Sequence, residues 1–166
     1  MRFFNVLLLI SMSAFSQMSD DPNNWTVVTD QVMGGKSELK ADYDQGTIQL
    51  KGYVTTENNG GFVRLAHSPE SISNDIKGIK FMAKGNDETY EIHVTMKGIK
   101  WPPWGYHSTT FDVDGEWKEY YVEFKDFKNN SYISPSLKPK NIRDISFAGY
   151  GRDFDVDLAI KDVSFF

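Results

Sequence analysis

Residues 30–37 read DQVMGGKS, and residues 57–62 read ENNGGF. The first stretch ends in Gly35-Lys36-Ser37, which is also how a phosphate-binding loop of the form GxxxxGK[ST] ends. That motif needs a glycine at position 30, where this chain has Asp30, whose carboxylate repels phosphate. The residues after Ser37 have the pattern of strand and turn, so no helix N-terminus would face an anion. The sequence therefore argues against a nucleotide site and leaves the paired glycines to be explained.

Paired glycines give the backbone access to positive φ and let another chain approach closely. The pairs at 34–35 and 60–61 each precede a candidate strand, which predicts two tight corners or bulges whose backbones touch. Two roles remain open for the polar residues of these corners. In the first, the side chains of Asp30 and Asn58 only satisfy turn amides. In the second, one rim of a ligand site comprises Asp30, Asn58, Asn59 and Arg64.

Alternating apolar and polar residues recur from residue 25 onward. In TIQLKGYVT (47–55), for example, Ile48, Leu50 and Val54 share one face. No segment has the pattern of a long amphipathic helix, although short helical turns are predicted at 69–76 and 125–128. The candidate strands lie at 25–29, 36–42, 47–55, 61–67, 78–84, 89–97, 105–112, from 117 to 124, and around 145–147 and 156–160. Regular short strands separated by turn signals predict an all-β jelly-roll sandwich of about ten strands.

The first 16 residues have the parts of a secretory signal peptide. Arg2 precedes an apolar run, and small residues lead from that run to Ser16. The run is shorter than the roughly 20 apolar residues that cross a bilayer. We therefore predict cleavage after Ser16, a short lead at 17–24 and a single domain at 25–166, in a protein that is exported to the periplasm or secreted.

The composition excludes several classes of function. The chain has no Cys, which rules out disulfides, thiol catalysis and cysteine metal sites. Its formal net charge of −5 argues against nucleic acid as a partner, because phosphate backbones are bound by an excess of basic residues. No GxSxG elbow is present and no pair of carboxylates is singled out by its spacing, so the sequence predicts no enzyme.

The two glycine stretches resemble the signatures of the complex I intermediate-associated protein 30 family. That family begins with a Trp, then an Asp, then V-M-G-G-x-S, and its second signature is N-x-G-G-F after a strand with a conspicuous glycine. The family places a small residue and then Arg after the Phe, where this chain has Val63 and Arg64. The resemblance covers about residues 25–166. The matching residues are Trp25, Asp30, Met33, Gly34, Gly35 and Ser37, then Asn58, Asn59, Gly60, Gly61 and Phe62.

This resemblance implies a galactose-binding-like jelly roll, the architecture of many carbohydrate-binding modules. It also implies a non-catalytic role like that of a chaperone-like assembly factor for a respiratory complex, which acts on a protein partner. An exported chain would not do that job in the same way, so the resemblance implies a binding role more firmly than it implies a partner.

An aromatic loop indicates an alternative ligand, a carbohydrate. The stretch WPPWGYH (101–107) holds two indoles and a phenol between prolines that stiffen the loop, and sugar rings stack on such aromatics. In the other interpretation of this stretch, the loop only folds back over the edge of the sandwich. We place a ligand face at this loop and at the polar row of strand 89–97, which carries Glu91, His93, Thr95 and Lys97. The predicted ligand contacts are Arg64, His93, Trp101, Trp104, Tyr106 and His107.

Metal ligands are sparse. His93 and His107 lie on a predicted hairpin and would both face one side, but zinc needs at least one more ligand. Asp153, Asp155 and Asp157 alternate along one strand and form either a solvated face or a structural Ca²⁺ site. The sequence predicts no resident metal or cofactor.

Overall fold

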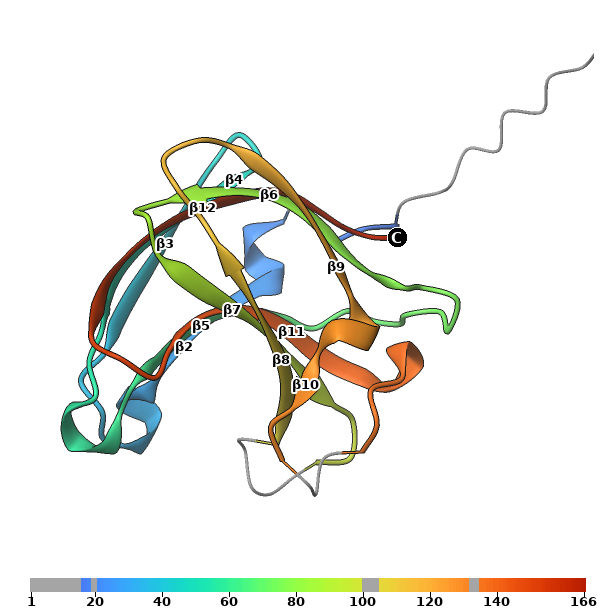
Figure 1. Ribbon diagram of the computed structural model, residues 1–166, viewed down its shortest axis with the longest axis horizontal. Coiled ribbons are helices and arrows are strands. Elements are labelled where there is room, and N and C mark those ends of the chain that lie inside the picture. The colour runs from blue at the N-terminus through green and yellow to red at the C-terminus, as the bar shows by residue number, and fades with distance from the viewer. Residues whose placement is uncertain (1–15, 19–20, 100–104, 132–134) are drawn as a thin grey trace, which may run out of the picture.

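The computed structural model describes residues 16–18, 21–99, 105–131 and 135–166, which form two antiparallel β-sheets packed face to face (Figure 1). Sheet A has the order β3-β4-β12-β6-β9, and β1 pairs with the end of β12. Sheet B has the order β10-β8-β7-β11-β5-β2. Strands distant in the chain therefore lie side by side, as in a jelly roll: β12 between β4 and β6, and β11 between β5 and β7.

The strands of sheet A are β1 (Ser16–Gln17), β3 (Glu38–Asp44), β4 (Thr47–Val54), β6 (Gly78–Gly85), β9 (Lys118–Glu123) and β12 (Phe154–Phe165). Those of sheet B are β2 (Trp25–Thr29), β5 (Phe62–His67), β7 (Thr89–Met96), β8 (Tyr106–Asp112), β10 (Lys128–Asn129) and β11 (Ile142–Tyr150). Short 3₁₀ turns are η1 (Pro22–Asn24), η2 (Asp30–Met33), η3 (Glu57–Asn59), η4 (Phe124–Asp126) and η5 (Pro139–Asn141). The described residues contain no α-helix, and so no helix able to cross a membrane.

The core lies between the two sheets, where the apolar side of each alternating strand is buried. Ile48, Leu50 and Val54 point inward from β4, as their spacing predicts. At the centre, the ring of Phe81 meets Phe147 edge to face, with ring centroids 5.0 Å apart. Burial of these apolar faces is the main term that stabilises the sandwich.

Two sequence-based expectations differ from the structure in detail. The strand predicted to begin at 36 begins at Glu38, because the backbone N–H of Ser37 donates to the Asp30 carboxylate instead of to a strand backbone. The helical turn predicted at 125–128 corresponds to η4, whereas the segment 69–76 contains no helix.

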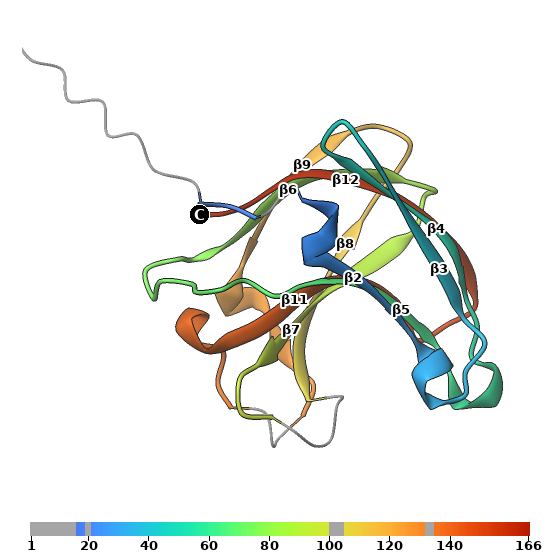
Figure 2. The same ribbon diagram turned by 180° about the vertical axis from the view of Figure 1, so that it is seen from behind.

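The sandwich is curved. In both views β11 follows an arch whose inside faces away from sheet A (Figure 1 and Figure 2). The face of sheet B that does not contact the core is therefore the inner side of a curved surface. Side chains that alternate with the core residues of β5, β7, β8 and β11 project from this side.

Candidate functional site

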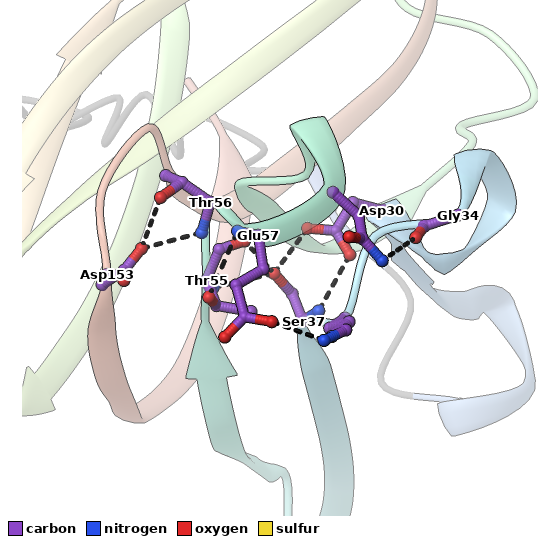
Figure 3. Close-up of polar contacts among 9 residues, drawn as sticks. Asp30, Gly34, Ser37, Thr55, Thr56, Glu57 and Asp153 are labelled. Atoms are coloured by element: carbon purple, nitrogen blue, oxygen red, sulfur yellow. Dashed lines mark hydrogen bonds and ion pairs between the residues drawn. The ribbon is translucent and has the colours of Figure 1, made fainter.

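The two glycine stretches meet at the carboxylate of Asp30 (Figure 3). Asp30 has no exposed surface, and its carboxylate accepts four hydrogen bonds. The Ser37 backbone N–H donates to Oδ1 at 2.9 Å, and the Ser37 hydroxyl donates to Oδ2 at 2.5 Å. The backbone N–H groups of Gly61 and Phe62 donate to Oδ2 at 2.6 and 3.2 Å. One carboxylate thus joins residues 30–37 to residues 57–62, a region we call the glycine corner.

The glycines of this corner make room for that carboxylate. A Cβ on Gly35 would lie 2.3 Å from the Asp30 Cγ, and a Cβ on Gly60 would lie 2.5 Å from its Oδ2. Both distances are far shorter than a van der Waals contact, so only glycine fits at these two positions. Gly61 has φ of 127°, a conformation that L side chains rarely adopt.

Further contacts brace the glycine corner from outside. The backbone of Asn58 is in the left-handed region, with φ of 57°. Its side-chain amide donates to the Gly34 carbonyl at 3.4 Å. Lys36 and Glu57 form an exposed ion pair at 2.5 Å (Figure 3). Asn59 also has a left-handed φ of 58°. The glycine corner is therefore held together by contacts among its own residues.

The electrostatics of Asp30 follow from these contacts. Burial by itself raises the pKa of the carboxyl group, because it penalises the charged form. The hydrogen bonds from Gly61, Ser37 and Phe62 together outweigh burial and hold the pKa of Asp30 below its usual value. The buried charge is stabilised by donors alone, and this arrangement supports the first of the two roles for Asp30, that of a structural tie.

Trp25 and Met33, the remaining family-signature residues, take different positions. Trp25 is buried, and its ring lies 4.9 Å from that of His67. Met33 is 56% exposed on η2, next to Val32. Met33 therefore contributes little to the core.

A second cluster lies on the outer face of sheet B, meaning the side chains of β5, β7, β8 and β11 that point away from sheet A. Strand pairing aligns them in rows. Phe62 lies opposite Tyr150, and Arg64 lies opposite Ala148, which in turn lies opposite Glu91. The next two rows carry Ser146, His93 and Ser108, then Asp144, Thr95 and Tyr106.

His93 is the centre of the aromatic part of this face. Its ring stacks on Tyr106 with centroids 4.2 Å apart, and Tyr150 meets it edge-on at 5.4 Å. His93 Nε2 lies 2.6 Å from the Glu91 Oε2. Burial lowers the pKa of His93 despite this carboxylate, so at pH 7 the imidazole is neutral and its Nε2–H donates to Glu91. Tyr150 is 42% exposed and presents this aromatic cluster to solvent.

Arg64 is the cation of the face. Its guanidinium carbon lies 5.5 Å from the centroid of the Phe62 ring. It forms no ion pair with any residue that the structure describes, and the nearby Asp144 is paired with Arg143 at 2.9 Å. Burial lowers the pKa of Arg64, which remains charged at neutral pH because the ordinary arginine value is above 12.

Three of the six predicted ligand contacts, Arg64, His93 and Tyr106, come together on this outer face. His107 does not, because it pairs with Val94 and so points to the core side, where its Nε2 lies 2.9 Å from the Pro135 carbonyl oxygen. The prediction that His93 and His107 share a side is therefore wrong. Trp101 and Trp104 lie outside the described residues.

Sequence analysis missed two contributors to the face, Tyr150 and Ser146. Both lie on β11, where Ser146, Ala148 and Tyr150 alternate with Ile145 and Phe147. The alternation of Ile145 and Phe147 indicated a strand. The small residues Ser146 and Ala148 between and beside them gave no sign that their own side of the sheet is also buried. Ser146 is fully buried.

The three carboxylates proposed for calcium do not converge. Asp153 accepts hydrogen bonds from the Thr56 N–H and hydroxyl at 2.7 and 2.8 Å (Figure 3). Asp157 accepts from Gln49 at 2.7 Å. Within the described residues, no three His, Cys, Asp or Glu side chains are grouped as a metal site.

Comparison with known proteins finds one family whose model matches most of the chain. The family model for Complex I intermediate-associated protein 30 matches residues 13–160. No curated protein sequence matches the chain.

The solved structures that share the fold include three carbohydrate-binding modules. A family 11 carbohydrate-binding module of a cellulosomal cellulase from Clostridium thermocellum has a TM-score of 0.73 at 17% identity, over 92% of this chain and 94% of that one. The family 11 module from the same organism in complex with a beta-1,3-1,4-mixed-linked tetrasaccharide has a TM-score of 0.71 at 16% identity, over 92% and 94%. A family 30 module of C. thermocellum has 0.64 at 15%, over 92% and 96%. The likeness shows the jelly-roll sandwich fold.

Proposed function

The chain belongs to the complex I intermediate-associated protein 30 family, and on that basis we propose that it is an exported, non-catalytic binding domain whose ligand lies on the outer face of sheet B. Family membership supports a binding role, and so does the fold shared with carbohydrate-binding modules. The glycine corner is not the ligand site in this proposal, because Asp30 is buried and engaged by backbone and hydroxyl donors.

The side-chain set of the outer face carries the proposal. Phe62 and Tyr150 lie side by side on β5 and β11, next to the cation Arg64. Tyr150 is exposed and Phe62 is half-buried, and rings beside hydrogen-bonding groups suit a sugar, which offers an apolar C–H face and a rim of hydroxyls. The geometry is therefore compatible with a glycan as the ligand. The structural neighbour solved with a mixed-linked tetrasaccharide has the same fold, which is compatible with this ligand class.

Polysaccharide affinity electrophoresis tests this function. Retention is expected on at least one gel of a panel of neutral and acidic polysaccharides. Tyr150→Ala should reduce the retention, and so should Trp101→Ala or Trp104→Ala if the predicted aromatic loop takes part. Tyr121→Ala is a matched control, because Tyr121 is an exposed tyrosine (55%) on β9 of the opposite sheet. Free migration of the wild-type chain through every gel would contradict the glycan proposal.

A protein partner is the second candidate, and the family itself favours it, since the family description names association with an intermediate of complex I. Affinity capture from the envelope fraction of the native cell is expected to recover one partner in stoichiometric amount. Recovery that survives a Tyr150→Ala change would place the partner elsewhere on the surface. Recovery of no stoichiometric partner would contradict this candidate.

Export is the remaining part of the proposal. The N-terminal sequence of the mature chain, read from periplasm or culture medium, is expected to begin at or within a few residues of Gln17. A mature chain that keeps Met1 would contradict export by a cleaved signal peptide.

A further inference from the structure

A hollow of about 180 Å³ lies at the end of the sandwich opposite to the glycine corner. Three segments that are far apart in the sequence surround it: the N-terminal lead with Pro22, the β3–β4 turn, and the β-bulge of β12 that follows Lys161. β4 begins at the hollow and ends at the glycine corner, which is roughly 23 Å away along the strand. Phe62 and Tyr150 lie opposite each other at the corner's end of sheet B, so the hollow is separate from both sites described above.

The hollow has an apolar floor. Met18, Trp25, Ile48 and Val163 line it and are buried. Tyr43 lines it too and is 37% exposed, at the end of a strand whose half-buried apolar residues pack against the core. Small-molecule sites are built in this way, from apolar and aromatic side chains with a few polar groups that fix the orientation of the ligand.

Polar residues line the hollow as well, and they are Asp44, Gln45, Thr47, Lys161 and Asp162. The side chains of Asp44 and Asp162 are exposed and form no hydrogen bond or ion pair with any residue that the structure describes. The ammonium nitrogen of Lys161 lies 4.6 Å from the centroid of the Trp117 ring. The hollow therefore offers two accessible carboxylates, which are strong hydrogen-bond acceptors, to a ligand.

The spacing of these carboxylates favours a ring that carries several hydroxyls. Asp44 lies opposite Thr47, which lies opposite Lys161. Two strand spacings, about 10 Å, therefore separate Asp44 from the bulge that carries Asp162. A sugar ring about 5 Å across, with a hydrogen bond of about 2.7 Å on each side, spans such a gap. A single ammonium ion is smaller than the gap.

The volume of the hollow agrees with one ring. It is the space of about six water molecules, which a sugar ring with its hydroxyls would replace. Pockets for drug-sized ligands are larger, at about 300–1,000 Å³. A hollow of this size encloses one unit of a glycan and does not follow a chain of several units.

We propose that this hollow binds one neutral sugar unit, either a free monosaccharide or the terminal unit of a glycan. Hydroxyls of the sugar donate to Asp44 and Asp162, and the Gln45 amide and the Thr47 hydroxyl both donate and accept. The ring of Tyr43 and the apolar floor meet the C–H face of the sugar. The proposal goes beyond the ligand face of sheet B, because no residue assigned to that face lines the hollow.

A ¹⁵N NMR titration of the full chain tests the inference, with glucose, galactose, mannose, xylose and N-acetylglucosamine as the probes. At least one sugar is expected to shift the amide signals of residues 43–48 and 161–163 and to leave those of β5 and β11 in place. Asp44→Asn and Asp162→Asn should each weaken the binding of that sugar about ten- to a hundredfold, the range set by the loss of a hydrogen bond to a charged group.

The chain offers a matched control for each variant. Asp42→Asn changes an exposed carboxylate on the same strand as Asp44. Asp87→Asn is matched to Asp162→Asn, because both residues are exposed and have a left-handed φ, of 56° and 53°. Asparagine tolerates that backbone region, and thermal unfolding of each variant shows that the fold is kept. Both controls, and Tyr150→Ala on sheet B, are expected to leave the affinity for the sugar unchanged.

Methyl glycosides of the sugar that binds distinguish the two sources of the unit. Equal binding of the α- or the β-methyl glycoside assigns the terminal unit of a glycan, because the hollow then accepts a substituent at the linking oxygen. Loss of binding with both glycosides assigns the free monosaccharide.

The outcomes also separate this inference from the proposed function. No shift at residues 43–48 with any sugar, or unchanged affinity in both Asp44→Asn and Asp162→Asn, would overturn the sugar site whatever the polysaccharide gels show. Free migration through every gel, with the shifts at residues 43–48 present, would contradict the ligand face of sheet B and leave the hollow as a sugar site. Binding of choline that both variants lose, without binding of any sugar, would overturn the sugar class in favour of an organic cation.

Discussion

The Oδ2 atom of Asp30 accepts a hydrogen bond from the backbone nitrogen of Gly61 at 2.6 Å, across 31 residues of sequence. The same oxygen accepts from the Ser37 hydroxyl, so one side chain holds the ends of β3 and β5, which belong to different sheets. This contact explains why two glycine pairs recur in one chain. They line a cage around a carboxylate that forms no ion pair with any of the residues that the structure describes.

Replacing Asp30 by Asn should destabilise the fold. The amide has the same shape, but it replaces an acceptor by a donor, and the cage contains four donors. We expect a loss of about 3 kcal/mol in the free energy of unfolding, because the amide leaves buried donors of the cage without an acceptor. Urea denaturation measures it. Asp42→Asn, at an exposed position of β3, is the control. Equal midpoints for the two variants would contradict a structural role for the cage.

Gly35→Ala and Gly60→Ala should each destabilise the protein by about 3 kcal/mol, because the new Cβ overlaps the Asp30 carboxylate at 2.3 and 2.5 Å. Gly115→Ala should be close to neutral, since no atom lies within 4 Å of a Cβ there. Thermal unfolding by circular dichroism compares all three. A normal melting temperature for Gly35→Ala would mean that the corner can open without cost.

Acid should destabilise the protein in two steps. Burial lowers the pKa of His67 and of His93, so below the unfolded value of about 6.5 the unfolded state binds more protons than the native state. Stability is thus complete above about pH 6.5 and falls as pH drops through the lowered native values. The lowered pKa of Asp30 adds a second loss below about pH 4. Urea midpoints from pH 8 to pH 3 record this profile, and a flat midpoint between pH 7.5 and pH 5 would contradict the first step.

Thr95→Val and Ser146→Ala should each raise the stability of the protein. Each removes a buried hydroxyl without a partner, which should add about 1 kcal/mol to the free energy of unfolding of the free protein. Urea denaturation of each variant measures this gain. A variant that loses stability would show that the hydroxyl is satisfied in the free protein.

Phe62→Ala and Tyr150→Ala should weaken ligand binding by about tenfold or more, because aromatic side chains dominate the energy of many binding faces. Phe62 also belongs to the glycine corner through its backbone N–H, which the substitution keeps. Affinity electrophoresis measures the change, with Tyr121→Ala as the control. Unaltered retention in both variants would move the binding surface away from this face.

Local patterns predicted the strands well. Alternation along β4, β6 and β7 depends on residues close in sequence, and a side chain's direction in a strand follows from its position alone. The face assignments of Ile48, Leu50 and Val54 were therefore correct. The glycine pairs were correctly interpreted as corners, since their conformational freedom is a property of the residue.

The relation between strands was harder to predict. His93 and His107 sit on neighbouring strands of one hairpin, yet they point to opposite sides because His93 pairs with Ser108. A shift of one residue in register exchanges the two faces, and the alternation along each strand does not by itself set that register.

The sequence by itself determined the all-β architecture, the family and the two glycine corners, because each depends on short-range patterns of side-chain type. Only the tertiary structure decided which side chains lie together on the outer face of sheet B. Sheet pairing brought Arg64, Ser146 and Thr95, from three separate strands, onto one diagonal, and the same pairing buried Asp30 among donors from both corners. These are contacts between residues far apart in the chain, and no local pattern encodes their distance.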